Sequence, residues 1–100
     1  MTNIDLRARI LLTLQSALIG EVTAGMQAVL VSWTEENISL RILFSSPPSL
    51  DEVETASRIE TEMISHLPEF SIQIRIEEAC GKPTPTVGET FAFLRSSDLA

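Results

Sequence analysis

Apolar residues in the first twenty positions recur at the spacing of an amphipathic helix. Between Asn3 and Ile19, one helical face collects Leu6, Ile10, Leu14, Ala17 and Leu18. Leu11 and Leu12 widen this apolar stripe. Thr2 or Asn3 can supply the N-cap oxygen, and Gly20 favours a stop at the other end. The pattern predicts a helix over residues 3–19.

Two strands are predicted next. Residues 26–33 are apolar in both alternation phases, with Met26, Ala28 and Leu30 in one and Val29, Val31 and Trp33 in the other. Such a strand is typically central or covered on both faces. Thr34–Asn37 is a polar break of hairpin length, and apolar and polar residues then alternate from Ile38 to Ser45. The second strand is therefore expected to run antiparallel to the first.

A second helix follows Pro47 and Pro48, which end the strand because proline cannot donate to a sheet ladder. Ser49 and Glu52 have the spacing of a capping box. The predicted buried side of this helix consists of Val53, Ala56, Ile59 (or Glu60 beside it), Met63 and Leu67. Pro68 ends the helix.

The last third of the chain predicts two more strands. Phe70, Ile72, Ile74 and Ile76 alternate with polar residues up to Glu77. Glycines and prolines make residues 79–88 a loop. Residues 89–95 then form a strand, with Phe91 and Phe93 in one phase.

The predicted element order is α-β-β-α-β-β in one domain that covers residues 1–100. The expected fold class is α+β, with a four-stranded sheet and both helices packed on one of its faces. Hydrophobic residues are 44% and charged residues 21% of the chain, as in globular proteins.

The net charge limits the classes of partner that the chain is expected to bind. Fourteen acidic residues stand against seven Lys and Arg, which gives a formal net charge of −7. Nucleic acid and anionic membrane surfaces are unfavourable partners, because both attract cations. A cationic partner fits, although soluble proteins without a charged partner are also often acidic.

The acidic residues cluster in the middle of the chain. Residues 50–78 hold eight acids and two bases, a net charge of −6. The second helix is thus the acidic element, joined at the strand ends by the pairs Glu35–Glu36 and Glu77–Glu78. Concentrated like charge repels itself, and a cationic partner relieves that repulsion. The clustering therefore favours a binding function.

No catalytic, metal or cofactor motif is apparent. His66 and Cys80 are the only histidine and cysteine, too few for a structural zinc site. No glycine-rich phosphate loop is present, and neighbouring carboxylates on a strand point to opposite faces. We expect no enzyme activity, no metal and no cofactor. A single cysteine and a start without a signal peptide or membrane span favour the cytoplasm.

Several segments resemble a known group of small bacterial proteins. They are Leu18–Thr23, the apolar strand that ends at Trp33 before an acidic turn, Pro48–Glu52, Leu67–Phe70, and the spacing of Pro83, Pro85 and Gly88. The group is labelled colicin-like, or immunity proteins of contact-dependent growth-inhibition toxins. This chain departs from it by lacking tyrosine and by having Ala24–Gly25 where Pro–Asn is usual.

The resemblance implies a cytosolic inhibitor that binds the C-terminal domain of a cognate toxin. Many such toxins are nucleases, whose basic grooves suit an acidic inhibitor. The candidate partner-binding residues are Trp33, Glu35, Glu36, Asp51, Glu54, Arg58, Glu62, Glu77 and Glu78. Trp33 has two interpretations, a residue that closes the core and an interface anchor.

Two other functions stay open. In the first, the chain is a self-associating structural or adaptor domain, and a sheet edge or open face pairs with a second copy to form a homodimer. In the second, His66 and Cys80 meet in a small enzyme.

Overall fold

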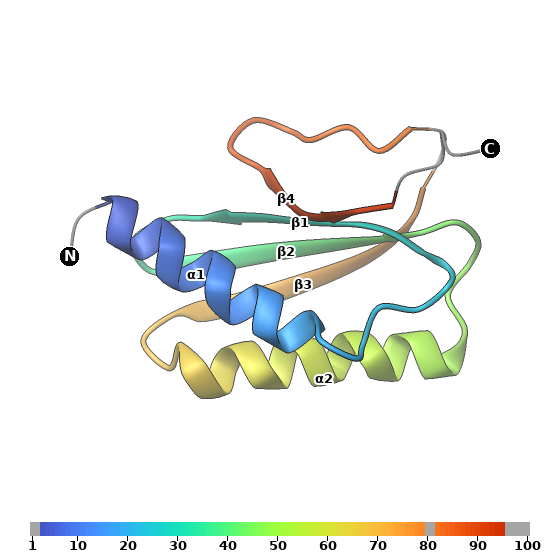
Figure 1. The fold of residues 1–100 in the computed structure, drawn as a ribbon, viewed down its shortest axis with the longest axis horizontal. Coiled ribbons are helices and arrows are strands. Elements are labelled where there is room, and N and C mark those ends of the chain that lie inside the picture. Colours follow the sequence, from blue (N-terminus) through green and yellow to red (C-terminus); the bar gives the residue numbers. More distant parts are fainter. Residues whose placement is uncertain (1–2, 80–81, 96–100) are drawn as a thin grey trace.

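The computed structural model describes residues 3–79 and 82–95. The order α-β-β-α-β-β is confirmed (Figure 1). The elements are α1 (Asn3–Leu18), β1 (Met26–Trp33), β2 (Asn37–Phe44), α2 (Leu50–His66), β3 (Ser71–Glu78) and β4 (Thr90–Leu94).

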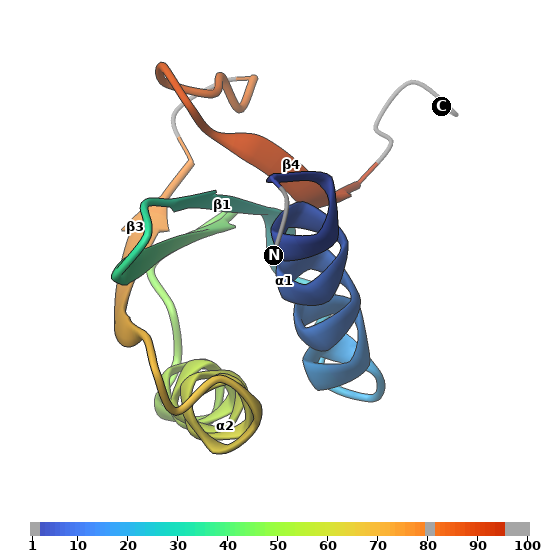
Figure 2. The same ribbon diagram turned by 90° about the vertical axis from the view of Figure 1, so that its left-hand side faces the viewer.

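The four strands form one sheet in the order β3-β2-β1-β4. β1 pairs antiparallel with β2 and β4, and β2 pairs parallel with β3. Figure 2 shows α1 and α2 side by side on one face of this sheet, while the β3–β4 connection lies on the opposite side. The predicted α+β fold with both helices on one face is confirmed, and β1 is central, as its apolar pattern predicts.

Local sequence signals set the ends of α2. Ser49 Oγ accepts a hydrogen bond from the backbone N–H of Glu52 at 3.2 Å, and the Ser49 N–H donates to Glu52 Oε1 at 3.1 Å. This is the predicted capping box. The Leu67 N–H closes the other end by donating to the Met63 carbonyl at 2.9 Å. The expectation that Val53 is buried is wrong, because Thr55 faces the core instead and Val53 is 43% exposed.

The main core lies between the helices and the sheet. Its buried helix residues are Ile10, Leu14, Ala17, Leu18, Ala56, Ile59, Met63 and Leu67. They pack against β1 and β2 residues such as Val29, Leu40 and Phe44. Leu12 does not join this core. It is 67% exposed, so the expectation that it widens the buried stripe of α1 is wrong.

Two β-bulges change which side chains share a face. Met26 pairs with Phe44 and Ala28 with Leu43, which leaves Gln27 as an extra residue in β1. Met26 therefore packs in the main core, whereas Ala28 and Leu30 lie in a second cluster. The predicted common phase of these three residues is wrong.

The second bulge lies in β4 and separates two phenylalanines. Val29 pairs with Phe93 and Leu30 with Phe91, so Ala92 is the extra residue in β4. Phe93 packs against the main core, and Phe91 packs on the second cluster. The prediction that both rings share one phase is wrong, because the extra residue reverses the alternation.

The sheet face opposite the helices is partly covered. Ala28, Leu30 and Leu43 are buried there, with Phe91 and Ala79 packed against them. In Figure 2, the described part of the β3–β4 connection rises on this side of the sheet. The helix-free face therefore has its own small apolar cluster.

Candidate partner-binding site

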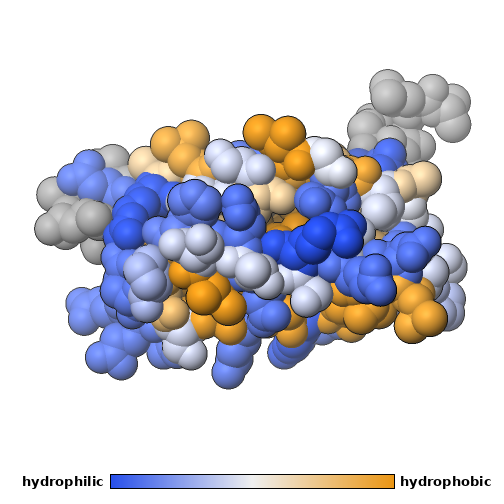
Figure 3. All heavy atoms as spheres, turned by 90° about the horizontal axis from the view of Figure 1, so that it is seen from below, coloured by the Kyte–Doolittle hydropathy of each residue, from blue (hydrophilic) through white to orange (hydrophobic). Residues whose placement is uncertain are grey.

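One side of α2 carries most of its acidic side chains. Asp51, Glu54, Arg58 and Glu62 are spaced by three, four and four residues, which places them on one side of the helix. Glu60 is rotated by about 160° from Glu62 and lies on another side. We call Asp51, Glu54 and Glu62 the acidic flank of α2. Seen from below, hydrophilic and apolar side chains share the surface of the molecule (Figure 3).

The single cation of this flank is already paired. Arg58 Nε and Nη2 both donate to Glu21 Oε1, at 3.1 and 3.0 Å, and Arg58 Nη2 also donates to Thr55 Oγ1. The bond to Glu21 is the main reason that the pKa of Arg58 is raised, with the charges of Glu54 and Asp51 adding to it. Across the part of the chain that the structure describes, none of the three acids of the flank forms an ion pair of its own.

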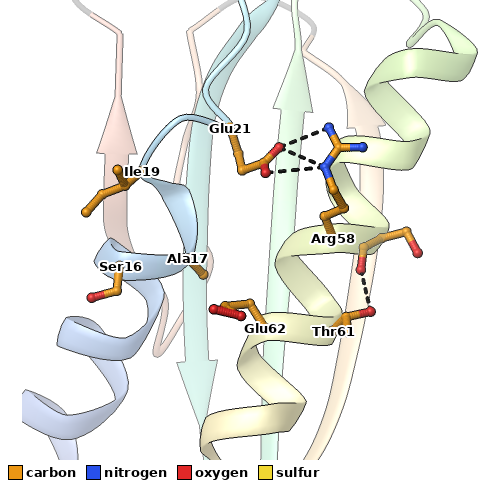
Figure 4. A pocket seen from close by; sticks show the side chains of 8 residues that line it. Ser16, Ala17, Ile19, Glu21, Arg58, Thr61 and Glu62 are labelled. Carbon is orange, nitrogen blue, oxygen red and sulfur yellow. Dashed lines mark hydrogen bonds and ion pairs between the residues drawn. The ribbon is translucent and has the colours of Figure 1, made fainter.

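A groove runs between α1 and α2 beside the acidic flank. Its larger hollow, of about 400 Å³, is lined by Ser16, Ala17, Ile19, Glu21, Ser57, Arg58, Thr61 and Glu62. A second hollow of about 200 Å³ is lined by Leu12, Thr13, Ser16, Glu62 and His66. Ser16 and Glu62 line both hollows, so the two are neighbours, and we call them together the α1–α2 groove. Figure 4 shows Glu62 pointing from α2 toward Ala17 of α1.

Ion pairs hold the two helices at both ends of this groove. Arg58 and Glu21 close the end near the start of α2. Arg9 of α1 binds Glu69, which follows α2, and also donates to the His66 carbonyl at 3.5 Å. The Arg9 hydrogen bond lowers the pKa of Glu69. Each end of the groove is therefore bordered by an ion pair.

The acidic pairs at the strand ends do not form one patch. Glu35 and Glu36 are exposed in the β1–β2 turn, whereas Glu77 and Glu78 end β3. In the parallel register, Asn37 is opposite Ser71 and Phe44 is opposite Glu78. Eight-residue strands separate the two pairs by roughly 23 Å, so each lies toward a different end of α2. No single small interface includes all nine candidate residues.

Trp33 lies at the end of β1, beside the Glu35–Glu36 turn. It is partly buried and packs against the main core. Arg7 of α1 stacks over its ring, with the guanidinium carbon 5.9 Å from the ring centre. These contacts give Trp33 a role in closing the core, and the rest of its surface faces solvent.

Arg41 is the centre of a hydrogen-bond network on the sheet face opposite the helices. Its Nε and Nη2 donate to Glu89 at 3.0 and 2.7 Å, its Nη1 to Glu77 at 3.2 Å, and its Nη2 to the Thr84 carbonyl at 3.0 Å. The Arg41 side chain is only 14% exposed. These bonds tie the β3–β4 connection to the centre of β2. Glu77, a predicted contact residue, is thereby neutralised by Arg41 and by Arg75, whose hydrogen bond is the first cause of its lowered pKa.

Acid should weaken the protein through Glu89. Hydrogen bonds from Arg41 lower the pKa of Glu89 from 4.5 to about 2, and the carboxylate is 11% exposed. A lowered pKa in the folded state stabilises the protein above pH 4.5, and this stability is lost as pH falls toward 2. We expect the free energy of unfolding, measured in urea, to fall by on the order of 3 kcal/mol across this range. A Glu89→Gln variant should show a flatter pH dependence, and an unchanged slope would contradict this assignment.

The residues considered for catalysis are not brought together by any described contact. His66 is exposed at the end of α2, where its Nδ1 lies 3.0 Å from the Glu62 carbonyl. Cys80 lies outside the described residues. Across residues 3–79 and 82–95, no three His, Cys, Asp or Glu side chains group as metal ligands. Over the same residues, no helix has the length and apolar character needed to cross a membrane.

Comparison with known families decides the identity of the chain. The MafI2 immunity protein family matches residues 7–97. The chain belongs to this family. The resemblance to small bacterial immunity proteins is confirmed, and an immunity function against a toxin is supported. No curated protein matches the chain.

Two features of the surface of this MafI2 family member were not predicted from the sequence. Leu12 was predicted in the buried stripe, and no role was predicted for Ser16 or Ile19, which line the groove. Their spacing of four and three residues continues one side of α1 into the turn that follows it, which is a signal in the sequence. Arg41 and Glu89 were also missed, because their contact joins positions 48 residues apart.

Proposed function

We propose that this chain is a cytosolic immunity protein that binds the C-terminal domain of a cognate toxin and blocks its activity without catalysis. Membership of the MafI2 immunity protein family carries this proposal. Immunity proteins of this kind are generally non-catalytic. The resemblance to contact-dependent growth-inhibition systems supports a toxin delivered by a neighbouring cell.

The toxin is proposed to be a nuclease with a basic substrate groove. The acidic flank of α2 supports this, because Asp51, Glu54 and Glu62 have no ion-pair partner within the described chain. Arg58, which lies between them on the helix, forms its ion pair with Glu21 instead. Unpaired surface carboxylates attract a basic surface and accelerate association with it.

The test is co-expression with the toxin domain encoded in the neighbouring gene. The chain should restore growth, and purified protein at a 1:1 ratio should stop cleavage of a labelled nucleic acid. An immunity protein for an unrelated toxin is the control and should not protect. Loss of growth despite co-expression, with no complex detected, would refute the immunity function. Protection from a toxin that cleaves no nucleic acid would refute only the nuclease assignment.

A further inference from the structure

The α1–α2 groove has a pattern of its own along α1. Leu12 and Ser16 lie four residues apart on one side of α1, and Ile19 follows three residues later in the turn directly after the helix. The buried stripe of α1 uses other positions, among them Ile10 and Leu14. The groove-lining stripe therefore makes no contribution to the main core.

Two apolar side chains stand at the two ends of this stripe. Leu12 is 67% and Ile19 is 79% exposed. Leu12 is in the second half of α1, and Ile19 is the first residue after its end. Leu12 lines the smaller hollow and Ile19 lines the larger one. Each hollow thus has an apolar wall that is open to a partner.

Between these apolar walls lies a carboxylate without a partner. Glu62 lines both hollows, and its carboxylate accepts no hydrogen bond from the described residues. In the neighbouring ion pairs, Arg58 binds Glu21 and Arg9 binds Glu69, so neither arginine pairs with Glu62. Glu62 is therefore the free charge at the centre of the groove.

Small side chains leave room beside Glu62. The larger hollow is lined by the short side chains of Ser16 and Ala17 from α1 and of Ser57 and Thr61 from α2. In Figure 4, Ser16 and Ala17 are the α1 residues drawn beside Glu62, and both are short. The room and the charge together fit a long cationic side chain, whose apolar stem packs along the groove walls.

We propose that the groove binds a segment of the toxin in which a lysine or arginine is flanked on both sides by apolar side chains. The cation pairs with Glu62, and the apolar residues cover Leu12 and Ile19. Helical peptides in grooves are recognised in this way, by anchors that repeat along one side. This inference rests on the proposed immunity function and names the surface that performs it.

Matched substitutions test the charge. Glu62→Gln and Glu60→Gln each remove one acid from α2, but Glu60 does not line the groove. We expect Glu62→Gln to weaken binding of the toxin C-terminal domain by at least about 10-fold, mainly through faster dissociation, because a buried charge pair loses one partner. Glu60→Gln should change the affinity by less than about 2-fold. Surface plasmon resonance measures both rates.

A second pair of variants tests whether toxin binding needs the open space of the groove. Ser16→Trp fills the groove without changing the charge, and Ser46→Trp places the same ring on an exposed residue between β2 and α2. We expect Ser16→Trp to weaken binding by about 100-fold and Ser46→Trp to have little effect. Ser16 is exposed, so its substitution should leave the thermal unfolding midpoint nearly unchanged.

The outcomes separate this inference from the proposed function. Wild-type protein that binds the toxin, together with full affinity in both Ser16→Trp and Glu62→Gln, would overturn the groove and leave the immunity function standing. A loss in Ser16→Trp alone would overturn the cationic occupant. If the wild-type protein does not bind the toxin, both proposals fail.

Discussion

Replacing Arg41 with glutamine should lower the free energy of unfolding by about 3 kcal/mol, the largest effect of any surface-facing substitution we expect. Arg41 is 14% exposed and compensates Glu77 and Glu89 together. Its removal leaves the Glu89 carboxylate, which is 11% exposed, without its charged partner, and it also leaves the Thr84 carbonyl without its donor. Urea denaturation at pH 7 measures this loss.

Arg75 provides the matched control. It also binds Glu77, at 2.7 Å, but its side chain is 73% exposed. An exposed ion pair contributes little, so Arg75→Gln should cost less than about 1 kcal/mol. Equal losses in the two variants would contradict the larger stabilisation expected from the nearly buried Arg41. The Arg41→Gln variant should also lose part of the acid dependence expected for Glu89.

Reversing two charges on the acidic flank should slow association with the toxin by roughly 10- to 100-fold at low salt. The Glu54→Lys/Glu62→Lys variant changes the formal net charge from −7 to −3, and both residues belong to the acidic flank of α2. The difference from the wild-type protein should shrink as salt rises, because the Debye length falls to about 10 Å at 0.1 M. Stopped-flow or surface plasmon resonance gives the association rates.

The control is Glu35→Lys/Glu36→Lys, which makes the same change in net charge at the β1–β2 turn. Long-range attraction depends on total charge, so this variant should also slow association, but by less than the α2 variant. A larger loss in the turn variant would move the interface to the end of the sheet near Trp33.

The order of the elements and most of the buried helix residues could be predicted because their signals are local. Ser49 and Glu52 set the start of α2, and the spacing of Ile10 and Leu14 set the inner side of α1. Such signals depend on residues within two helical turns.

The faces of the strand residues were harder to predict. One extra residue at Gln27 and another at Ala92 reverse the alternation within β1 and β4. Nothing in the sequence marks either bulge, since neither position is a glycine. A period of two assigns Phe91 and Phe93 to one face, and only the pairing register separates them.

The candidate site was predicted only in part. The sequence identified the acids of α2 but could not show that Arg58 is occupied by Glu21, 37 residues away. It also could not show that the strand-end acids lie apart, because their separation depends on the parallel pairing of β2 with β3. Long-range pairing decides which charges are free.

Two sets of residues on and directly after α1 have different roles. Ile10 and Leu14 hold the fold, whereas Leu12, Ser16 and Ile19 are open to solvent and carry no packing constraint. Substitutions at the latter three positions create no internal cavity, so they can vary at little thermodynamic cost. A library randomised at these positions should therefore yield folded proteins with new toxin preferences, which makes α1 a natural site for evolving orthogonal inhibitor–toxin pairs.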